Sequence, residues 1–213
     1  MSKYLKEINA IVACDLNHAI GLNGKLPWEG KLKSEMHHFA RHTRNVPGNI
    51  ATKKGKNAVV MGRKTWQSIP EKFRPLKGRF NVVLSNSLKN SEKNDSGGGG
   101  DYVIKTGLTE ALQFLDARED IFKIWIIGGS SLYEEAISGK ICDNLFITRI
   151  LEKFEGTDTF IPDPVGFGYV KLEKSVALDL KEVHSEDGMR YRYEIWKKSE
   201  DLSSSEDYSS DSS

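Results

Sequence analysis

Six short runs rich in valine, isoleucine and other apolar residues recur along this 213-residue chain, and they limit the possible folds more than any other feature. The expected strands are residues 8–14, 57–62, 80–85, 102–105, 123–129 and 143–150. Apolar runs of this length without polar alternation are typical of strands covered on both faces. Helical patterns separate several of them, at residues 32–43, 64–68, 108–116 and 130–138. This repeated order of strand, helix and strand predicts right-handed crossovers and a mainly parallel sheet.

The C-terminal third follows a different pattern. Residues 169–180 and 189–198 alternate apolar and polar side chains more regularly, which predicts an antiparallel pair at one edge of the sheet. We therefore expect one α/β domain over residues 1–198, with a twisted, mainly parallel eight-stranded sheet, an antiparallel C-terminal edge and about four flanking helices. In such a sheet, ligands bind at the carboxyl ends of the strands.

Two segments have compositions that predict little ordered structure. Residues 90–101 are polar and glycine-rich, which is typical of a flexible loop inside the domain. Residues 199–213 are rich in serine and acids and nearly free of apolar residues, which predicts a disordered tail. The tail is either a phosphorylation target or an inert solvated segment, and composition leaves both possibilities open.

Charge and cysteine usage narrow the class of protein. The tail holds five of the 30 acids and no Lys or Arg, so residues 1–198 carry 31 basic and 25 acidic residues. No basic run contains interleaved aromatics, so nucleic acid is not an expected partner. No segment is apolar enough for a leader or a membrane span, and Cys14 and Cys142 lie in apolar runs without metal-ligand spacing. We expect no metal, and a cytoplasmic protein that can also be nuclear.

The helix expected over 32–43 carries a misplaced charge. Leu32, Met36, Phe39 and Thr43 recur at spacings that form one apolar face, and Lys33, Ser34, His37, His38 and Arg41 lie largely away from it. Glu35 falls on the apolar side. Burial of a carboxylate raises its pKa towards neutrality, as an acid that works near pH 7 requires. The alternative is a structural salt bridge from Glu35 to Lys31 or Arg79.

A turn-rich segment, GLNGKLPWE, precedes this helix. It presents two large apolar side chains, Leu26 and Trp28, among glycines, an asparagine and a proline. A lid that excludes water from a hydride-transfer site has this character. A loop that is simply held to the core by its tryptophan would look the same.

Two junctions between a strand and a helix suit phosphate groups. The first, VVMGRKTW, places Gly62 before Arg63, Lys64 and Thr65 at a helix start. The second, WIIGGSSLYEEA, has paired glycines, Gly128 and Gly129, followed by Ser131 and Glu134 in a capping-box pattern. Together, at one end of a parallel sheet, they favour one elongated phosphate-bearing ligand.

Arg79 is a further candidate cation, in the segment RPLKGRFNVV. The planar guanidinium matches a carboxylate, so an arginine at the mouth of an apolar cleft would select a substrate with a carboxylate tail. A solvated surface arginine is the alternative.

Taken together, these stretches resemble the dihydrofolate reductases of animals and fungi. The matching segments, in family order, are IVAC, IGLNGKLPW, LKSEMHHF, VVMGRKTWQSIPEKFRPLKGRFNVVLS, WIIGGSSLYEEA, LFITRI, DTFIP and RYRYEIW. They span residues 8–198, and so many co-linear motifs make the match specific.

The resemblance implies that NADPH reduces 7,8-dihydrofolate to 5,6,7,8-tetrahydrofolate, which supports one-carbon metabolism and the synthesis of thymidylate and purines. Glu35 would hold the 2-amino group and ring N3 of the pterin and promote protonation at N5 through water, so that C6 accepts hydride. Leu26, Trp28 and Thr148 are the other catalytic candidates. The family also implies a monomer that binds antifolates such as methotrexate.

Binding residues follow from the same resemblance. The implied substrate contacts are Ile11, Ala13, Glu35, Met36, Phe39, Ser68, Ile69, Leu76, Arg79, Ile127, Tyr133 and Thr148. The implied cofactor contacts are Ala13, Ile20, Gly21, Gly62, Arg63, Lys64, Thr65, Ser85, Asn86, Gly128, Gly129, Ser130, Ser131, Leu132 and Tyr133. A cis peptide between Gly128 and Gly129 is also implied.

Two of these residues depart from the family pattern. Met36 stands where vertebrate members usually have phenylalanine, which predicts altered pterin and inhibitor affinity. Asn86 stands where many relatives have arginine near the 2′-phosphate, so Arg63 and Lys64 are left to favour NADPH over NADH.

Two other functions stay open at this point. One is a reductase of the same fold that acts on a pyrimidine intermediate of riboflavin synthesis, although Glu35, the LPW segment and Arg79 fit folate better. The other is a non-catalytic protein that binds folate or a nucleotide.

Overall fold

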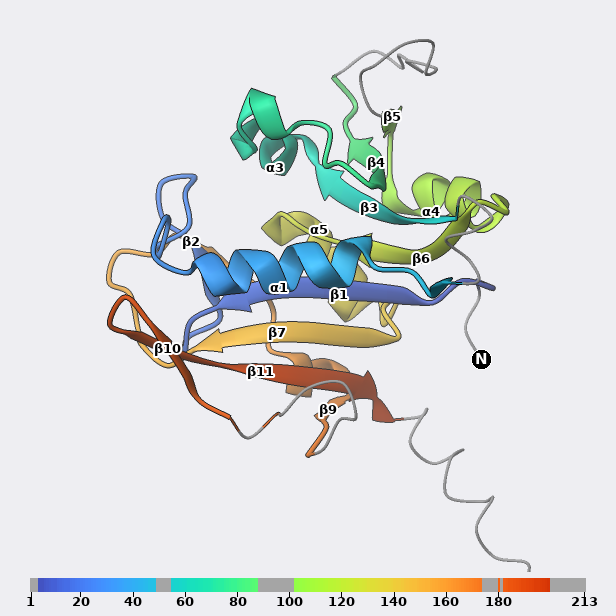
Figure 1. The fold of residues 1–213 in the computed structure, drawn as a ribbon. Coiled ribbons are helices and arrows are strands. Elements are labelled where there is room, and N and C mark those ends of the chain that lie inside the picture. The colour runs from blue at the N-terminus through green and yellow to red at the C-terminus, as the bar shows by residue number, and fades with distance from the viewer. Residues whose placement is uncertain (1–3, 49–54, 88–101, 174–179, 181, 200–213) are drawn as a thin grey trace, which may run out of the picture.

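The computed structural model describes residues 4–48, 55–87, 102–173, 180 and 182–199. The predicted loop at 90–101 lies outside these residues, and so does the predicted tail apart from Ser199. The described residues form a single α/β domain in which helices cover both faces of one large sheet (Figure 1).

Six parallel strands make up the larger part of this sheet. They are β1 (Ile8–Cys14), β3 (Lys56–Gly62), β4 (Arg79–Leu84), β5 (Tyr102–Lys105), β6 (Ile121–Ile126) and β7 (Asn144–Ile150). Their spatial order is β7-β1-β6-β3-β4-β5, and each neighbouring pair is parallel. The predicted parallel sheet is confirmed, and β1 lies deep inside it between β6 and β7.

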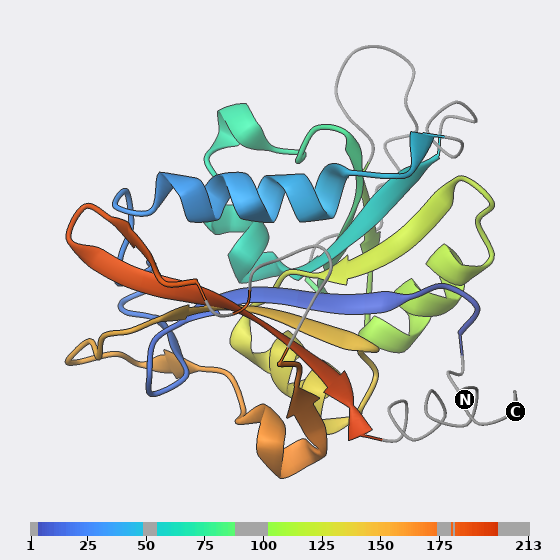
Figure 2. The same cartoon turned by 60° about the horizontal axis from the view of Figure 1, so that its bottom comes forward.

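The four α-helices of the described residues match the predicted helices closely. They are α1 (Lys33–Arg44), α3 (Arg63–Ser68), α4 (Leu108–Asp116) and α5 (Ser130–Ser138). Short 3-10 turns follow at η1 (Glu71–Phe73) and η2 (Pro164–Phe167). The helices α1 and α3 lie on one face of the sheet, and α4 and α5 lie on the other (Figure 2).

Alternation along the strands divides the core between these two faces. Ile8, Ala10 and Val12 of β1 pack with the buried leucines and alanines of α4 and α5. Ile11, which points the other way, belongs to a second cluster that contacts Phe39 of α1 and Trp66 of α3. Because both faces are covered, the strands are apolar at successive positions, and this produced the unbroken runs in the sequence.

The C-terminal edge is antiparallel, as predicted, but it contains more strands than expected. The long strand β11 (Met189–Lys198) pairs antiparallel with β7, with β10 (His184–Glu186) and with β9 (Tyr169–Lys171). The sheet therefore has nine strands among the described residues, one more than the eight predicted. Among the described residues, the predicted pairing of 169–180 with 189–198 is confirmed for β9 and is followed by a hydrogen bond from the N–H of Leu172 to the carbonyl of Ile195, whereas 174–179 lie outside the described residues.

A second, two-stranded sheet joins β2 (Ala19–Gly21) to β8 (Thr159–Phe160). The sequence did not predict this second sheet, because both strands are too short to show a periodic pattern. It anchors the start of the GLNGKLPWE segment to a distant part of the chain. Within the described residues, no helix is long and apolar enough to cross a membrane.

Candidate active site

Glu35 is buried in the first turn of α1. Its side chain is 5% exposed, and burial raises its pKa from 4.5 to about 7. Among the described residues, neither Lys31 nor Arg79 forms an ion pair with it, so the structural salt bridge considered as an alternative is absent there. A buried carboxylate with a near-neutral pKa is able to hold or release a proton at physiological pH.

The inward face of α1 differs from the predicted one. Glu35 and Thr43 are its buried residues, whereas Met36, which was expected to point inward, is 53% exposed. His38, which was expected to point away, is half-buried and stacks on Tyr193 of β11 with 3.8 Å between ring centroids. His42 likewise packs against Trp125 and Phe146. The face of α1 that meets the sheet therefore includes His38 and His42, which contact aromatic rings of β11, β6 and β7.

Tyr133 of α5 lies close enough to Glu35 for the carboxylate to raise its pKa, although burial is the larger cause. Its hydroxyl donates a hydrogen bond of 2.7 Å to the carbonyl of Ile11 on β1. Thr148, which is 1% exposed, is paired in register with Ala13 of β1. The sheet thus brings together four predicted contacts from α5, β1 and β7 at the carboxyl ends of β1 and β7.

Trp28 is 2% exposed and packs with Leu32, Ile150, Met189 and Tyr191. The tryptophan therefore holds its segment to the core, as the second interpretation of GLNGKLPWE proposed. Its indole Nε1 is buried and has no hydrogen-bond partner among the described residues. A buried N–H without a partner is costly and is a ready donor to a bound water or ligand.

The two flanks of this segment differ from Trp28. Leu26 is 40% exposed, and Ile20 is half-buried in β2. Gly21 lies against β8, where an added Cβ would come 2.9 Å from the Cβ of Thr159. Gly21 is therefore needed for the contact between β2 and β8, a role separate from the predicted cofactor contact.

Arg79 is not a solvated surface arginine, because it is 7% exposed at the start of β4. Its Nη1 donates to the hydroxyl of Thr43 on α1 at 2.9 Å, and its Nε donates to the carbonyl of Lys77 at 3.2 Å. Burial, followed by repulsion from Arg44, lowers its pKa to about 10. No acidic side chain pairs with Arg79 among the described residues, so its charge is available to a ligand carboxylate.

Three further predicted substrate contacts lie between α3 and β4. Ile69 and Leu76 are half-buried and pack on the cluster that contains Ile11 and Ile127. Ser68 is exposed, and its hydroxyl donates to the carbonyl of Thr65 at 2.8 Å. Phe39 of α1 packs on the same cluster as Ile69 and Leu76, and the guanidinium of Arg79 lies 6.0 Å from the centre of its ring.

The two glycine junctions meet at the carboxyl ends of β3 and β6. The N–H of Gly62 donates to the carbonyl of Gly128 at 2.7 Å, and the peptide between Gly128 and Gly129 is cis, as predicted. An added Cβ on Gly129 would lie 3.3 Å from the hydroxyl of Thr65, so little room remains for a side chain there. An added Cβ on Gly128 would lie 2.9 Å from Cε2 of Tyr133, so the packing of Tyr133 and Thr65 requires glycine at both positions.

Neither helix start at these junctions has a side-chain cap. The helix α5 begins after Gly129, so the predicted capping box of Ser131 and Glu134 is wrong, although the predicted helix is correct. Leu132 is buried, whereas Ser130 is half-buried and Ser131 exposed. An uncapped helix start attracts an anion.

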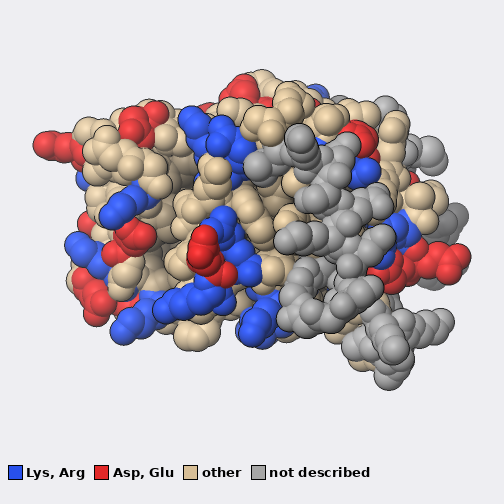
Figure 3. Space-filling model, turned by 90° about the horizontal axis from the view of Figure 1, so that it is seen from above, with Lys and Arg blue, Asp and Glu red and all other residues tan. Residues whose placement is uncertain are grey.

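The remaining cofactor candidates surround α3 and the end of β4. Lys64 is exposed, and Arg63 donates to Gln67 at 3.0 Å. Ser85 is buried at the end of β4, next to the exposed Asn86. Lys and Arg side chains gather on the face of the molecule that carries α3 (Figure 3). This part of the site therefore suits the phosphate-bearing end of a ligand.

Comparison with known proteins agrees with this geometry. A model of the family described as dihydrofolate reductase matches residues 7–198. The chain is 40% identical to the dihydrofolate reductase of Mus musculus over 198 residues, which cover 91% of this chain and 98% of the relative. The corresponding enzyme of Gallus gallus is 41% identical over 202 residues, covering 92% and 98%, and that of Drosophila melanogaster is 39% identical over 191 residues, covering 89% and 97%.

The chain belongs to the dihydrofolate reductase family. The predicted family and the predicted class of enzyme, an oxidoreductase, are confirmed.

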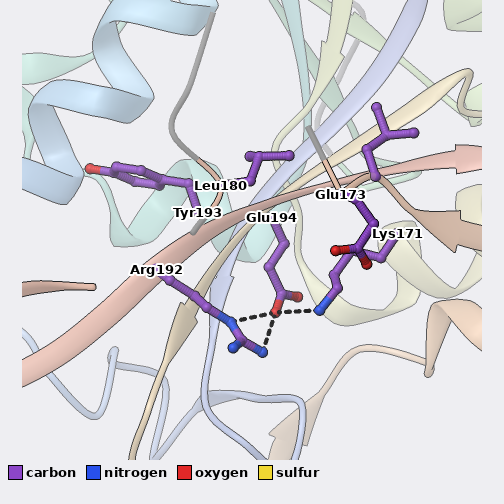
Figure 4. A pocket seen from close by; sticks show the side chains of 7 residues that line it. Lys171, Glu173, Leu180, Arg192, Tyr193 and Glu194 are labelled. Carbon is purple, nitrogen blue, oxygen red and sulfur yellow. Dashed lines mark hydrogen bonds and ion pairs between the residues drawn. The ribbon is translucent and has the colours of Figure 1, made fainter. Parts of the chain in front are cut away.

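The described residues also form a pocket beside β11, and Tyr193 both lines this pocket and lies near Glu35. This pocket of about 250 Å³ is lined by Lys171, Leu172, Glu173, Leu180, Arg192, Tyr193 and Glu194 (Figure 4). None of these residues was predicted as a site residue of a dihydrofolate reductase. The carboxylate of Glu194 lies 3.0 Å from Arg192 and 4.0 Å from Lys171, so cations of the pocket are paired with it.

Sequence reasoning missed Tyr193, which lies near the site of this dihydrofolate reductase family member. It is paired in register with Thr148, and Glu35 contributes to raising its pKa, after burial and Tyr191. The alternation in MRYRYEIW could have indicated its face, but the pattern carries no information on which helix covers that face.

Proposed function

We propose that this protein reduces 7,8-dihydrofolate to 5,6,7,8-tetrahydrofolate with NADPH, as a cytoplasmic monomer that can also enter the nucleus. The observation that carries the proposal is Glu35, a carboxyl group 5% exposed with a pKa of about 7, in a member of the dihydrofolate reductase family. The relatives in mouse and chicken are named for this activity. The product would serve one-carbon metabolism and the synthesis of thymidylate and purines.

Glu35 would bind the 2-amino group and ring N3 of the pterin. In that position it receives two N–H donors, and its raised pKa allows it to favour protonation at N5 through water. Protonation at N5 makes C6 electrophilic. Leu26, Trp28 and Thr148 would complete the catalytic group, Trp28 by offering its unpaired Nε1–H to a water or to the pterin and by keeping bulk water out.

The substrate's other end would be read by different residues. Ile11, Ala13, Met36, Phe39, Ile127 and Tyr133 would contact the pterin, and Ser68, Ile69 and Leu76 the aminobenzoyl group. Arg79, already oriented by Thr43, would bind the glutamate α-carboxylate. Antifolates would compete for the same residues.

The residues around the paired glycines fit NADPH. Three observations support this fit. The N–H of Gly62 donates to the carbonyl of Gly128, and a side chain at position 129 would be crowded, because its Cβ would lie 3.3 Å from the hydroxyl of Thr65. The start of α5 has no side-chain cap. Gly128, Gly129, Ser130, Ser131 and Leu132 would hold the pyrophosphate, and Gly62, Arg63, Lys64, Thr65, Ser85 and Asn86 the adenosine phosphates. Ala13, Ile20, Gly21 and Tyr133 would border the nicotinamide. NADPH, when bound, supplies the hydride.

Oxidation of NADPH followed by absorbance, with dihydrofolate as substrate, tests the proposal. We expect turnover with dihydrofolate and none with the pyrimidine intermediate of riboflavin synthesis. Glu35→Gln should lose most activity at pH 7 and recover part of it at lower pH, where solvent protonates N5. A folded protein without turnover would favour the non-catalytic alternative, and unchanged activity of Glu35→Gln would refute the role of Glu35.

A further inference from the structure

The helix that carries Glu35 has no cap of its own. The residue before α1 is Leu32, whose side chain makes no capping hydrogen bond. Leu32 is instead 3% exposed and packs with Trp28, Ile150, Met189 and Tyr191. The N-cap position is thus used for apolar packing, and the first backbone N–H groups of α1 need acceptors from elsewhere.

Those acceptors come from the hairpin formed by β10 and β11. Glu186, the last residue of β10, accepts a hydrogen bond from the N–H of Lys33 at 3.0 Å and one from the N–H of Ser34 at 2.9 Å. A different carboxylate oxygen receives each bond. These two hydrogen bonds are the main cause that holds the pKa of Glu186 below its ordinary value.

The same hairpin contacts α1 again one turn later. Tyr193 of β11 stacks on His38 at 3.8 Å with the ring planes 12° apart. Glu35 lies between these two attachments, since Lys33 and Ser34 precede it and His38 follows it by one turn. The hairpin therefore holds the turn that contains Glu35 from both sides.

The carboxylate of Glu186 also has an electrostatic effect on this turn. Backbone N–H groups make a helix start positive, which favours the ionised form of a nearby carboxyl. A negative charge bonded to those same N–H groups offsets this effect and favours the protonated form of Glu35. Glu186 also contributes to raising the pKa of Tyr193, a group that Glu35 affects as well.

Of the other titratable groups near Glu35, the two tyrosines and His38 are neutral, whereas the charge of Lys33 offsets part of the charge of Glu186. Tyr133 on α5 and Tyr193 on β11 both have raised pKa values and stay neutral in the range of the assay. On α1 itself, the pKa of His38 is lowered to about 3, so the imidazole is neutral, and Lys33 is exposed and lies near Glu186.

We propose that Glu186 is a positioning residue for Glu35, which holds the first turn of α1 in place and keeps the Glu35 carboxyl group protonated at higher pH. This role rests on the proposed function of Glu35. The hairpin of β10 and β11 contributes none of the predicted substrate or cofactor contacts. Through Glu186 it would nevertheless influence the protonation of Glu35.

The variant Glu186→Gln tests this role, because it removes the charge while leaving one oxygen as an acceptor. The matched control is Asp187→Asn, which removes the same charge one residue away, at an exposed turn position with φ of 47° that asparagine tolerates. The pKa of Glu35 is measured by NMR with ¹³C-labelled glutamate carboxyls, and its signal is assigned by its loss in Glu35→Gln.

We expect the pKa of Glu35 to fall by about 0.3 to 0.7 pH unit in Glu186→Gln, and by clearly less in Asp187→Asn. The shift should shrink as salt is added, because the side chain of Glu186 is only half-buried and its charge is screened by ions. At pH above the pKa of Glu35, kcat should fall by about two- to fivefold in line with that shift, while KM for NADPH stays unchanged.

Equal pKa values of Glu35 in the two folded variants would overturn the proposal. The NMR titration needs no turnover, so its result is separate from the function itself. If the unaltered protein has no reductase activity but Glu186→Gln still shifts the pKa of Glu35, then the proposed function fails and the electrostatic coupling stands.

Discussion

The burial of Glu35 makes a quantitative prediction about stability. The carboxyl group has an ordinary pKa of 4.5 in the unfolded chain and a pKa of about 7 in the folded protein. The difference of about 2.5 pH units corresponds to about 3 kcal/mol, at about 1.36 kcal/mol per unit. This is a large part of the stability of an ordinary domain.

The sign follows from proton binding. Because the folded protein binds this proton more tightly, the free energy of unfolding loses the contribution of Glu35 as pH rises from about 4.5 through about 7. Below pH 4.5 the group is protonated in both states and costs nothing through ionisation. Above pH 7 the folded state must bury a charge, so the full penalty of about 3 kcal/mol applies.

Glu35→Gln removes the titration and keeps the shape of the side chain. We expect the free energy of unfolding of the variant, relative to the unaltered protein, to increase by about 3 kcal/mol between pH 4.5 and pH 8.5. Urea denaturation of the ligand-free protein at several pH values measures this difference. The control is the same substitution at an exposed glutamate of α5, Glu134→Gln, measured over the same pH range.

A difference between Glu35→Gln and the unaltered protein that stays constant from pH 4.5 to pH 8.5 would refute this reasoning. It would mean that another group stabilises the negative charge of Glu35 in the folded protein. The pKa of Glu35 would then not be near neutrality and would no longer support its role as an acid. If the prediction holds, the residue that we propose as the acid of the site also costs stability at neutral pH.

Two further predictions concern the edges of the site. Gly128→Ala should lower the free energy of unfolding by about 1 to 3 kcal/mol and weaken NADPH binding, because φ is 105° and the new Cβ would lie 2.9 Å from Cε2 of Tyr133. Urea denaturation measures the first effect and calorimetry the second. Gly107→Ala, where nothing lies within 4 Å of the new Cβ, is its control, and equal losses would contradict the steric argument. Arg79→Gln should raise KM for dihydrofolate at least tenfold, which corresponds to a loss of about 1.4 kcal/mol of binding free energy. For a substrate that lacks the glutamate, KM should stay unchanged. Equal effects on both substrates would exclude a contact between Arg79 and the carboxylate.

Local sequence patterns were sufficient for the elements and the class of fold. The strand at 8–14 and the helices at 108–116 and 130–138 have the predicted bounds, because apolar periodicity and β-branched composition act over neighbouring residues. Helical spacing also placed Glu35 on the inward side of α1, although a salt bridge to Lys31 or Arg79 stayed open as the alternative. The family resemblance then indicated which residues to examine, including the cis peptide at Gly128.

Patterns within one element failed where the outcome depended on a second element. Helical spacing indicated Met36 as inward and His38 as outward, but His38 stacks on Tyr193 of β11 and Met36 is 53% exposed. The same limit applies to the capping box at Ser131, since α5 starts directly after Gly129.

By itself, the sequence determined the alternation of strands and helices and the two glycine junctions, because each depends on contacts within a few residues of the chain. Only the tertiary structure decided what surrounds Glu35. Its helix is capped by Glu186, about 150 residues away in the chain, at 3.0 and 2.9 Å from the N–H groups of Lys33 and Ser34. Neither segment has a pattern that identifies the other, because a hydrogen bond between distant segments depends on how the sheet brings them together.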